Sequence, residues 1–154
     1  MAALAVTETL NHYLPADAEK FKIKWINDVH HSDRKISGAL CTCHNIGNAS
    51  FLSIGVGVNL NSSPVPGVSV HLHEIARLKE PINVDQFVRL LSSNLMTHFT
   101  QADLHGFEGE LYEAVNSKLD FLGKKVKIFD ETLTKVIITG VFKGINRFGH
   151  AKIL

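Results

Sequence analysis

Residues 22–28 (KIKWIND) are followed, seven residues on, by residues 35–38 (KISG), and these two segments are the most informative part of the chain. They place lysines, an amide and a carboxylate at one end of an apolar strand. Charged groups beside an apolar core are costly unless an opposite charge meets them. The pattern therefore predicts a strand end that binds an anion, such as a phosphate or a carboxylate.

Length and composition limit what this chain can be. Its 154 residues are 45% hydrophobic and 20% charged, which predicts one soluble core, or a core with a small appendage. A formal net charge of +1 gives no broad field that would attract nucleic acid. The apolar runs are too short to span a membrane, and the start lacks the basic residues of a signal peptide. We expect a cytoplasmic protein, with an organellar version left open.

Residues 51–61 predict a strand with two different faces. Alternate positions carry an aliphatic stripe suited to a core, while Gly55, Gly57 and Asn59 leave the other face nearly bare. Interior glycines weaken a strand and indicate close approach, either by a ligand or by a packed helix. Both interpretations remain open from the sequence. The aliphatic residues are Leu52, Ile54, Val56, Val58 and Leu60.

Lys24 and Lys35 also have two interpretations. A lysine at a strand end can reach over a sheet face as a point charge. Alternatively, both are edge lysines that discourage aggregation. Their proximity to the glycine-bearing strand favours the first interpretation.

Cys41, Cys43 and the paired histidines are similar to metal-ligand patterns, but no second ligand pair follows at zinc spacing. We expect both cysteines to be buried free thiols in a reducing compartment. We expect the histidines to be solvated. They are His30, His31, His71 and His73.

The hydrophobic periodicity predicts an α+β fold, in which a mixed or antiparallel sheet packs with helices and a small β module follows. We expect a boundary near residue 120, which divides the chain into residues 1–119 and 120–154. One long helix should begin after Asn83 as N-cap, with Val84, Phe87, Val88, Leu91, Leu95 and Phe99 on one face. The expected helices are 2–14, 70–79, the helix after Asn83 and 107–119, and the expected strands are 21–27, 36–44, 51–61, 124–129, 134–142 and 150–154, with 29–34 as a polar connection.

At this point the residues match a known family. Residues 24–28 (KWIND) resemble the Lys-Trp-Pro-Asn-Asp signature of the biotin–protein ligases, with Ile26 where proline is usual. Residues 33–40 (DRKISGAL) resemble the segment that follows it, and residues 54–61 (IGVGVNLN) resemble the family's Gly-Ile-Gly-Ile-Asn-Val-Asn strand. All three occur in family order, and the resemblance covers essentially the whole chain. The two later helices, followed by residues 123–126 (GKKV) and the β module, resemble the end of the family's catalytic domain and its SH3-like cap.

The resemblance implies an ATP-dependent enzyme that joins biotin to a lysine of a biotin carboxyl carrier domain through biotinyl-adenylate, with Mg²⁺. The departure at Ile26 should alter a turn more than the chemistry. The implied roles are catalysis by Lys35, phosphate and Mg²⁺ contacts by Asn27 and Asp28, a biotin and adenylate floor of Gly38, Gly55 and Gly57, an adenine contact by Asn59, and phosphate support by Lys24.

The 154 residues contain no counterpart of the Gly/Arg-rich loop that closes over biotin and adenylate in the family. We therefore expect a C-terminal portion of a ligase, ending within the SH3-like cap, with little or no ligation activity of its own. An N-terminal portion of the same enzyme is then an expected partner. Two alternatives stay open: a lipoate–protein ligase on the same scaffold, and a noncatalytic binding or interaction module.

Overall fold

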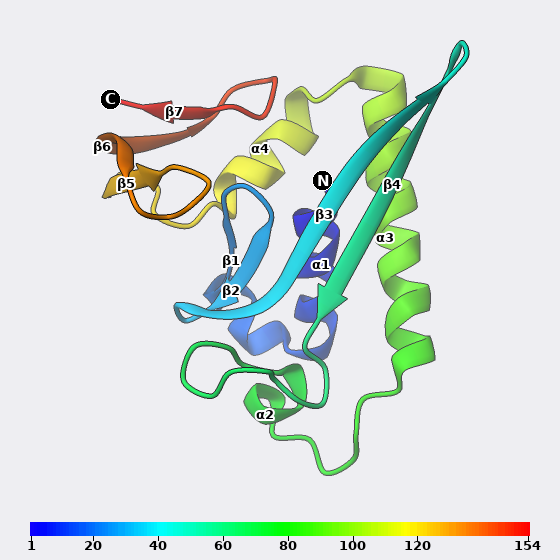
Figure 1. The fold of residues 1–154 in the computed structure, drawn as a ribbon. Helices are drawn as coiled ribbons and strands as arrows, with labels where there is room; N and C mark the ends of the chain where they lie inside the picture. Colours follow the sequence, from blue (N-terminus) through cyan, green and yellow to red (C-terminus); the bar gives the residue numbers. More distant parts are fainter.

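Two separate β-sheets and a group of helices make up the protein, in a computed structural model that describes residues 1–154 (Figure 1). The first sheet has the strand order β1-β2-β3-β4, and the second has the order β5-β6-β7. The predicted fold class is confirmed. The elements are α1 (Ala2–Tyr13), a 3-10 helix (Pro15–Lys20), β1 (Phe21–Lys24), β2 (Asp28–His31), β3 (Arg34–Ile46), β4 (Ala49–Val58), α2 (Leu72–Ala76), α3 (Val84–His105), α4 (Gly109–Ser117), β5 (Lys125–Phe129), β6 (Val136–Ile145) and β7 (Ala151–Ile153).

The core forms where α1 packs on the first sheet and α3 packs on α1. Because α1 is covered on two sides, nearly all of its first half is buried, and small alanines let the layers approach closely. Phe142 and Ile145 of β6 belong to the same hydrophobic cluster. The second sheet thus packs against the core formed by α1, α3 and the first sheet. The domain boundary expected near residue 120 stays a prediction.

The predicted polar connection over residues 29–34 is wrong, because Asp28–His31 forms strand β2. It pairs antiparallel with β1 on one side and with β3 on the other. Ser32 and Asp33, both with positive φ, form a two-residue turn of the kind that suits a tight hairpin. The sequence predicted two solvent-facing histidines here, yet His30 is 7% and His31 6% exposed. The expectation that they are solvated is therefore also wrong.

The long β3–β4 hairpin overturns a second group of expectations. β1 and β2 have four residues each, so the outer part of β3 and β4 has no neighbouring strand, and it projects from the molecule in Figure 1. Cys41 and Cys43 lie there and are exposed, where buried thiols were predicted. Leu52 is also half-exposed, although Val56, Val58 and Leu60 pack against the core as predicted.

Helix α3 begins as predicted, with the Asn83 side chain accepting a hydrogen bond from the Gln86 backbone N–H. Its apolar face is narrower than predicted. Phe87 and Leu91 are buried, whereas Val84 and Val88 are half-exposed because α1 covers only one side of the helix. None of the helices is both long enough and apolar enough to cross a membrane.

The buried histidines predict a loss of stability in mild acid. Burial lowers the pKa of His30; the nearby Lys24 and Lys35 lower it further, while Asp28 and Asp120 partly oppose the shift. Burial also lowers the pKa of His31, although its hydrogen bond to Asp17 acts in the opposite direction. The unfolded chain binds these protons more tightly, at a pKa of about 6.5. The stabilisation is thus present above that pH and is lost as pH falls through it toward the folded-state pKa.

We expect the free energy of unfolding, from urea titrations, to fall between about pH 7.5 and about pH 5.5. His30→Gln should flatten that dependence. His44→Gln, at an exposed position, is the control and should leave it unchanged. A stability that stays constant over this range in the parent protein would contradict the prediction.

Candidate active site

Four of the predicted site residues form one row across the first sheet. Lys24 pairs with Asp28, Asp28 with Gly38, and Gly38 with Gly57. Residues directly opposite each other in antiparallel strands place their side chains on the same face. The next pair whose side chains lie on this face, Leu40 with Gly55, extends it along the hairpin. We call these residues and Lys35 the glycine face; the opposite face packs on α1.

A β-bulge brings Lys35 onto the glycine face. Lys35 and Gly38 are three residues apart, so in a regular strand they would point to opposite faces. The register shifts at Val29/His30, where Ser37 pairs with Val29 but Lys35 with His30, so Ile36 is the extra residue. Ile36 is fully buried, and Lys35 is turned toward Asp28. Bulges often re-aim side chains beside active sites, and no local pattern in the chain indicates this one.

Lys35 and Asp28 form an ion pair above Gly38, with 2.7 Å between Lys35 Nζ and Asp28 Oδ1. The lysine side chain is 46% exposed and the aspartate 22% exposed, so the ammonium group remains accessible to an anion from solvent. A Cβ added at Gly38 would lie 3.0 Å from Asp28 Oδ1 and 3.1 Å from Lys35 Nζ. The absence of a side chain at Gly38 therefore makes room for the pair.

This geometry predicts the effect of Gly38→Ala. The atoms that the new methyl group meets are the ends of two side chains, so they can move at small cost and the melting temperature should change little. The Lys35–Asp28 pair must shift, and affinity for an anionic ligand should fall by about tenfold, as for a loss of about 1.4 kcal/mol. Calorimetric titration and thermal melting test both parts. Gly55→Ala, whose Cβ would meet only Leu40 O at 3.8 Å, is the control for stability.

The glycines of β4 face open space. For Gly55 and Gly57, the only atoms within 4 Å of an added Cβ are the Leu40 and Gly38 backbone oxygens, at 3.8 and 3.9 Å. No helix packs on them, so the structure contradicts the helix-packing explanation of these glycines. Of the two interpretations of the strand, close approach by a ligand remains.

The side chains of Asn27 and Asn59 both make hydrogen bonds within the protein, which the sequence did not indicate. The Asn27 side chain donates to the Ala39 carbonyl and lines the turn between β1 and β2. Asn59 lies just after β4, and its amide donates to Val70 O at 3.1 Å. The Val68–Val70 segment also pairs with Lys35, through Lys35 N to Val68 O and Val70 N to Lys35 O. Asn59 thus helps hold this segment beside Lys35, and an adenine contact would use its remaining hydrogen-bonding capacity.

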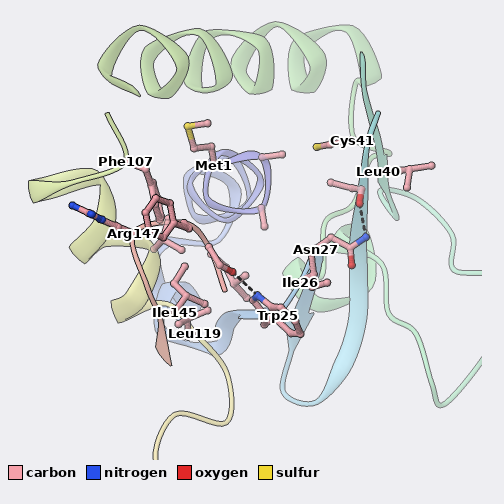
Figure 2. Close-up of a pocket in the computed structure, with 17 residues that line it drawn as sticks. Met1, Trp25, Ile26, Asn27, Leu40, Cys41, Phe107, Leu119, Ile145 and Arg147 are labelled. Atoms are coloured by element: carbon pink, nitrogen blue, oxygen red, sulfur yellow. Dashed lines mark hydrogen bonds between the residues drawn. The ribbon is translucent and has the colours of Figure 1, made fainter. Parts of the chain in front are cut away.

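The sequence analysis gave two residues near the site no role in it. His30 is buried on the glycine face between Lys22 and Lys35, and its Nδ1 has no partner. Trp25, which was noted only as part of a motif, donates from its indole N–H to the Gly149 carbonyl (Figure 2). The large apolar ring of Trp25, next to Lys24 in a charged segment, was a signal of burial, but its partner is 124 residues away in sequence.

A cavity of about 620 Å³ opens beside Trp25 and Asn27, at the N-terminal end of α1 (Figure 2). Hydrophobic side chains line most of it. Lys35, Asp28, Lys24 and the glycines at positions 38, 55 and 57 do not line it. The ion pair and the glycines therefore form an open sheet face outside this cavity, while Leu40, which belongs to that face, and Asn27 line the cavity.

Comparisons with known proteins agree with this fold. Residues 1–59 match the model of the Biotin/lipoate A/B protein ligase family. The bifunctional ligase/repressor BirA of Escherichia coli is 31% identical over 137 residues, covering 86% of this chain and 41% of BirA. The apo structure of the Aquifex aeolicus biotin protein ligase superposes with a TM-score of 0.79 at 25% identity, covering 99% of this chain and 65% of that one. A mutant of the same enzyme in complex with biotin gives the same TM-score and identity, with 61% of that chain covered. The chain thus spans about two fifths of the curated relative and under two thirds of these solved structures.

Proposed function

This chain belongs to the biotin–protein ligase family, and from that membership we propose that it takes part in the ATP-dependent attachment of biotin to a lysine of a biotin carboxyl carrier domain. The observation that carries the proposal is the accessible Lys35–Asp28 pair beside two glycines that face open space. Such a face suits a ligand that is negatively charged at one end and lies flat against the backbone.

The proposed reaction has two steps. A biotin carboxylate oxygen attacks the α-phosphorus of ATP, which gives biotinyl-adenylate and releases pyrophosphate. The acceptor amine, having lost a proton, then attacks the carbonyl carbon of this mixed anhydride and AMP leaves. Both reactants of the first step are anions, so a cation between them reduces their repulsion and stabilises the charge in the transition state.

The residues of the glycine face fit these needs. Lys35 supplies the cation, and Lys24, in the same row, supports the phosphates. Gly55 and Gly57 let biotin and the adenylate approach the backbone, and Gly38 leaves room for the ion pair. Asn27 and Asn59 flank this face at the turn before β2 and at the end of β4.

Magnesium fits the proposed site by way of Asp28. The chain has no cluster of three or more His, Cys, Asp or Glu side chains that could enclose a metal ion. Mg²⁺ is commonly bound by one or two carboxylates together with substrate phosphates, which matches one partly exposed aspartate. In that arrangement the ion would neutralise the charge of the ATP phosphates, while Lys35 orients the biotin carboxylate.

Equilibrium binding tests the proposal directly. Calorimetric titration with a non-hydrolysable analogue of biotinyl-adenylate should show saturable binding, at least about tenfold tighter than the lipoyl analogue, as for a difference of about 1.4 kcal/mol. Tighter binding of the lipoyl analogue would favour the lipoate ligase instead. Binding without pyrophosphate release from biotin and MgATP, in the ligase polypeptide that contains these residues, would favour the noncatalytic module.

We also propose that residues 1–154 by themselves transfer biotin slowly. The glycine face is open to solvent, and a reactive adenylate that is not sequestered is lost to hydrolysis. Labelling of a carrier domain by the purified chain, compared with an intact family member, tests this. Equal rates would contradict it.

A further inference from the structure

We propose that Trp25 is a positioning residue, through which the C-terminal sheet β5–β7 fixes the turn that carries Asn27 and leads directly into Asp28. The inference rests on the proposed function, since it concerns the anion site of that reaction. It adds that the second sheet acts on the site through one indole N–H, at a distance from the reacting atoms. The turn, residues 25–27, connects β1 to β2 and includes a cis Trp25–Ile26 peptide.

The first attachment of this turn is to the C-terminal sheet. Trp25 Nε1 donates to Gly149 O at 2.9 Å, the dashed line beside Trp25 in Figure 2. Gly149 lies between β6 and β7, and its own N–H donates to Asn146 O at 2.9 Å. The Asn146 side chain accepts from the backbone N–H groups of Phe148 and His150. The carbonyl that receives the indole is therefore held in a hydrogen-bonded turn.

The second attachment is to β3. The Asn27 side chain donates to Ala39 O, and Ala39 N donates back to Asn27 O at 3.0 Å. The turn thus lies between two anchors, one on each sheet. Asp28 follows it at once and carries the carboxylate that pairs with Lys35.

Loss of the indole anchor should therefore reach the ion pair. Without the indole bond, the turn keeps its Asn27–Ala39 bonds and the strand pairing at both ends but loses its link to the second sheet, so residues 25–27 gain freedom directly beside Asp28. A partly buried N–H without an acceptor is also costly, so the turn should stay docked as long as Gly149 O is in place. Small misplacements of a charged group at a site have large effects on the bound or reacting state.

Trp25→Phe removes the indole donor, and Tyr112→Phe is its matched control. Tyr112 OH donates to Ile145 O at 2.8 Å, so this side chain also links a residue outside the C-terminal sheet to β6. Tyr112 lies on α4, however, and not in the turn of residues 25–27. Since Trp25 is the sole tryptophan, residue-wide replacement by 3-benzothienylalanine gives a second variant that keeps the ring shape and lacks the donor.

Two measurements separate positioning from simple stabilisation. The first is amide hydrogen exchange at Ala39, whose N–H bonds to Asn27 O. The second is affinity for the non-hydrolysable biotinyl-adenylate analogue, corrected for the folded fraction. Both Trp25 variants should speed Ala39 exchange and weaken analogue binding by about tenfold, whereas Tyr112→Phe should change each by less than about twofold.

Each outcome is decisive. Equal effects of the Trp25 and Tyr112 variants, or no effect of either Trp25 variant, would overturn the positioning role while leaving the proposed function intact if the parent protein binds the analogue. Absence of analogue binding by the parent protein would refute the proposed function, and the role of Trp25 in that reaction with it.

Discussion

Lys35→Ala should reduce the rate of adenylate formation by several hundredfold, because the variant removes the cation that lies between the two anionic reactants. Loss of one such electrostatic group costs roughly 3–4 kcal/mol of transition-state stabilisation. The effect on stability should be small: the Lys35–Asp28 pair is partly exposed, and pairs of this kind contribute about 1 kcal/mol or less. Pyrophosphate release at saturating biotin and MgATP, in the ligase polypeptide that contains these residues, measures the rate.

Lys22→Ala is the control for Lys35→Ala. Lys22 shares the sheet face but pairs with Glu19 at 3.5 Å, away from the Gly38–Gly57 row. It should leave pyrophosphate release within about twofold, as for an exposed ion pair worth a few tenths of a kcal/mol. If Lys35→Ala also stayed within a few-fold of the parent, the catalytic role proposed for Lys35 would be wrong.

Gly57→Val should abolish detectable binding of the biotinyl-adenylate analogue while leaving the fold intact. Valine suits a strand, and an added Cβ at this position meets no atom closer than Gly38 O at 3.9 Å, so the protein itself has room for it. The ligand does not, because the valine methyl groups would stand where it lies against the backbone.

Ser53→Val is the matched control for Gly57→Val. Ser53 lies on the same strand and face, four residue pairs further out on the hairpin, opposite Thr42. It should leave both the melting temperature and the affinity near those of the parent. A large fall in melting temperature for Gly57→Val, with unchanged affinity in the folded fraction, would refute the proposal that the ligand lies there.

The sequence by itself determined those features that depend on neighbouring residues. The period of the apolar residues located α1 and α3, and Asn83 marked the start of α3, because capping and helical spacing are local effects. Strand alternation likewise placed Gly55 and Gly57 together on one face of β4, opposite Val56. The motifs around Lys24, Lys35 and Asn59 identified the family before any contact was known.

Only the tertiary structure decided how these pieces meet. The bulge at Ile36 turns Lys35 toward Gly38 and Asp28, and it arises from the pairing of β2 with β3. Strand β2 itself was missed since its histidines are buried by other elements, and Cys41 was misjudged since nothing covers the outer hairpin. The Trp25–Gly149 contact joins residues 124 positions apart. Register, coverage and long-range hydrogen bonds depend on which segments pack together, and no local period or propensity records that.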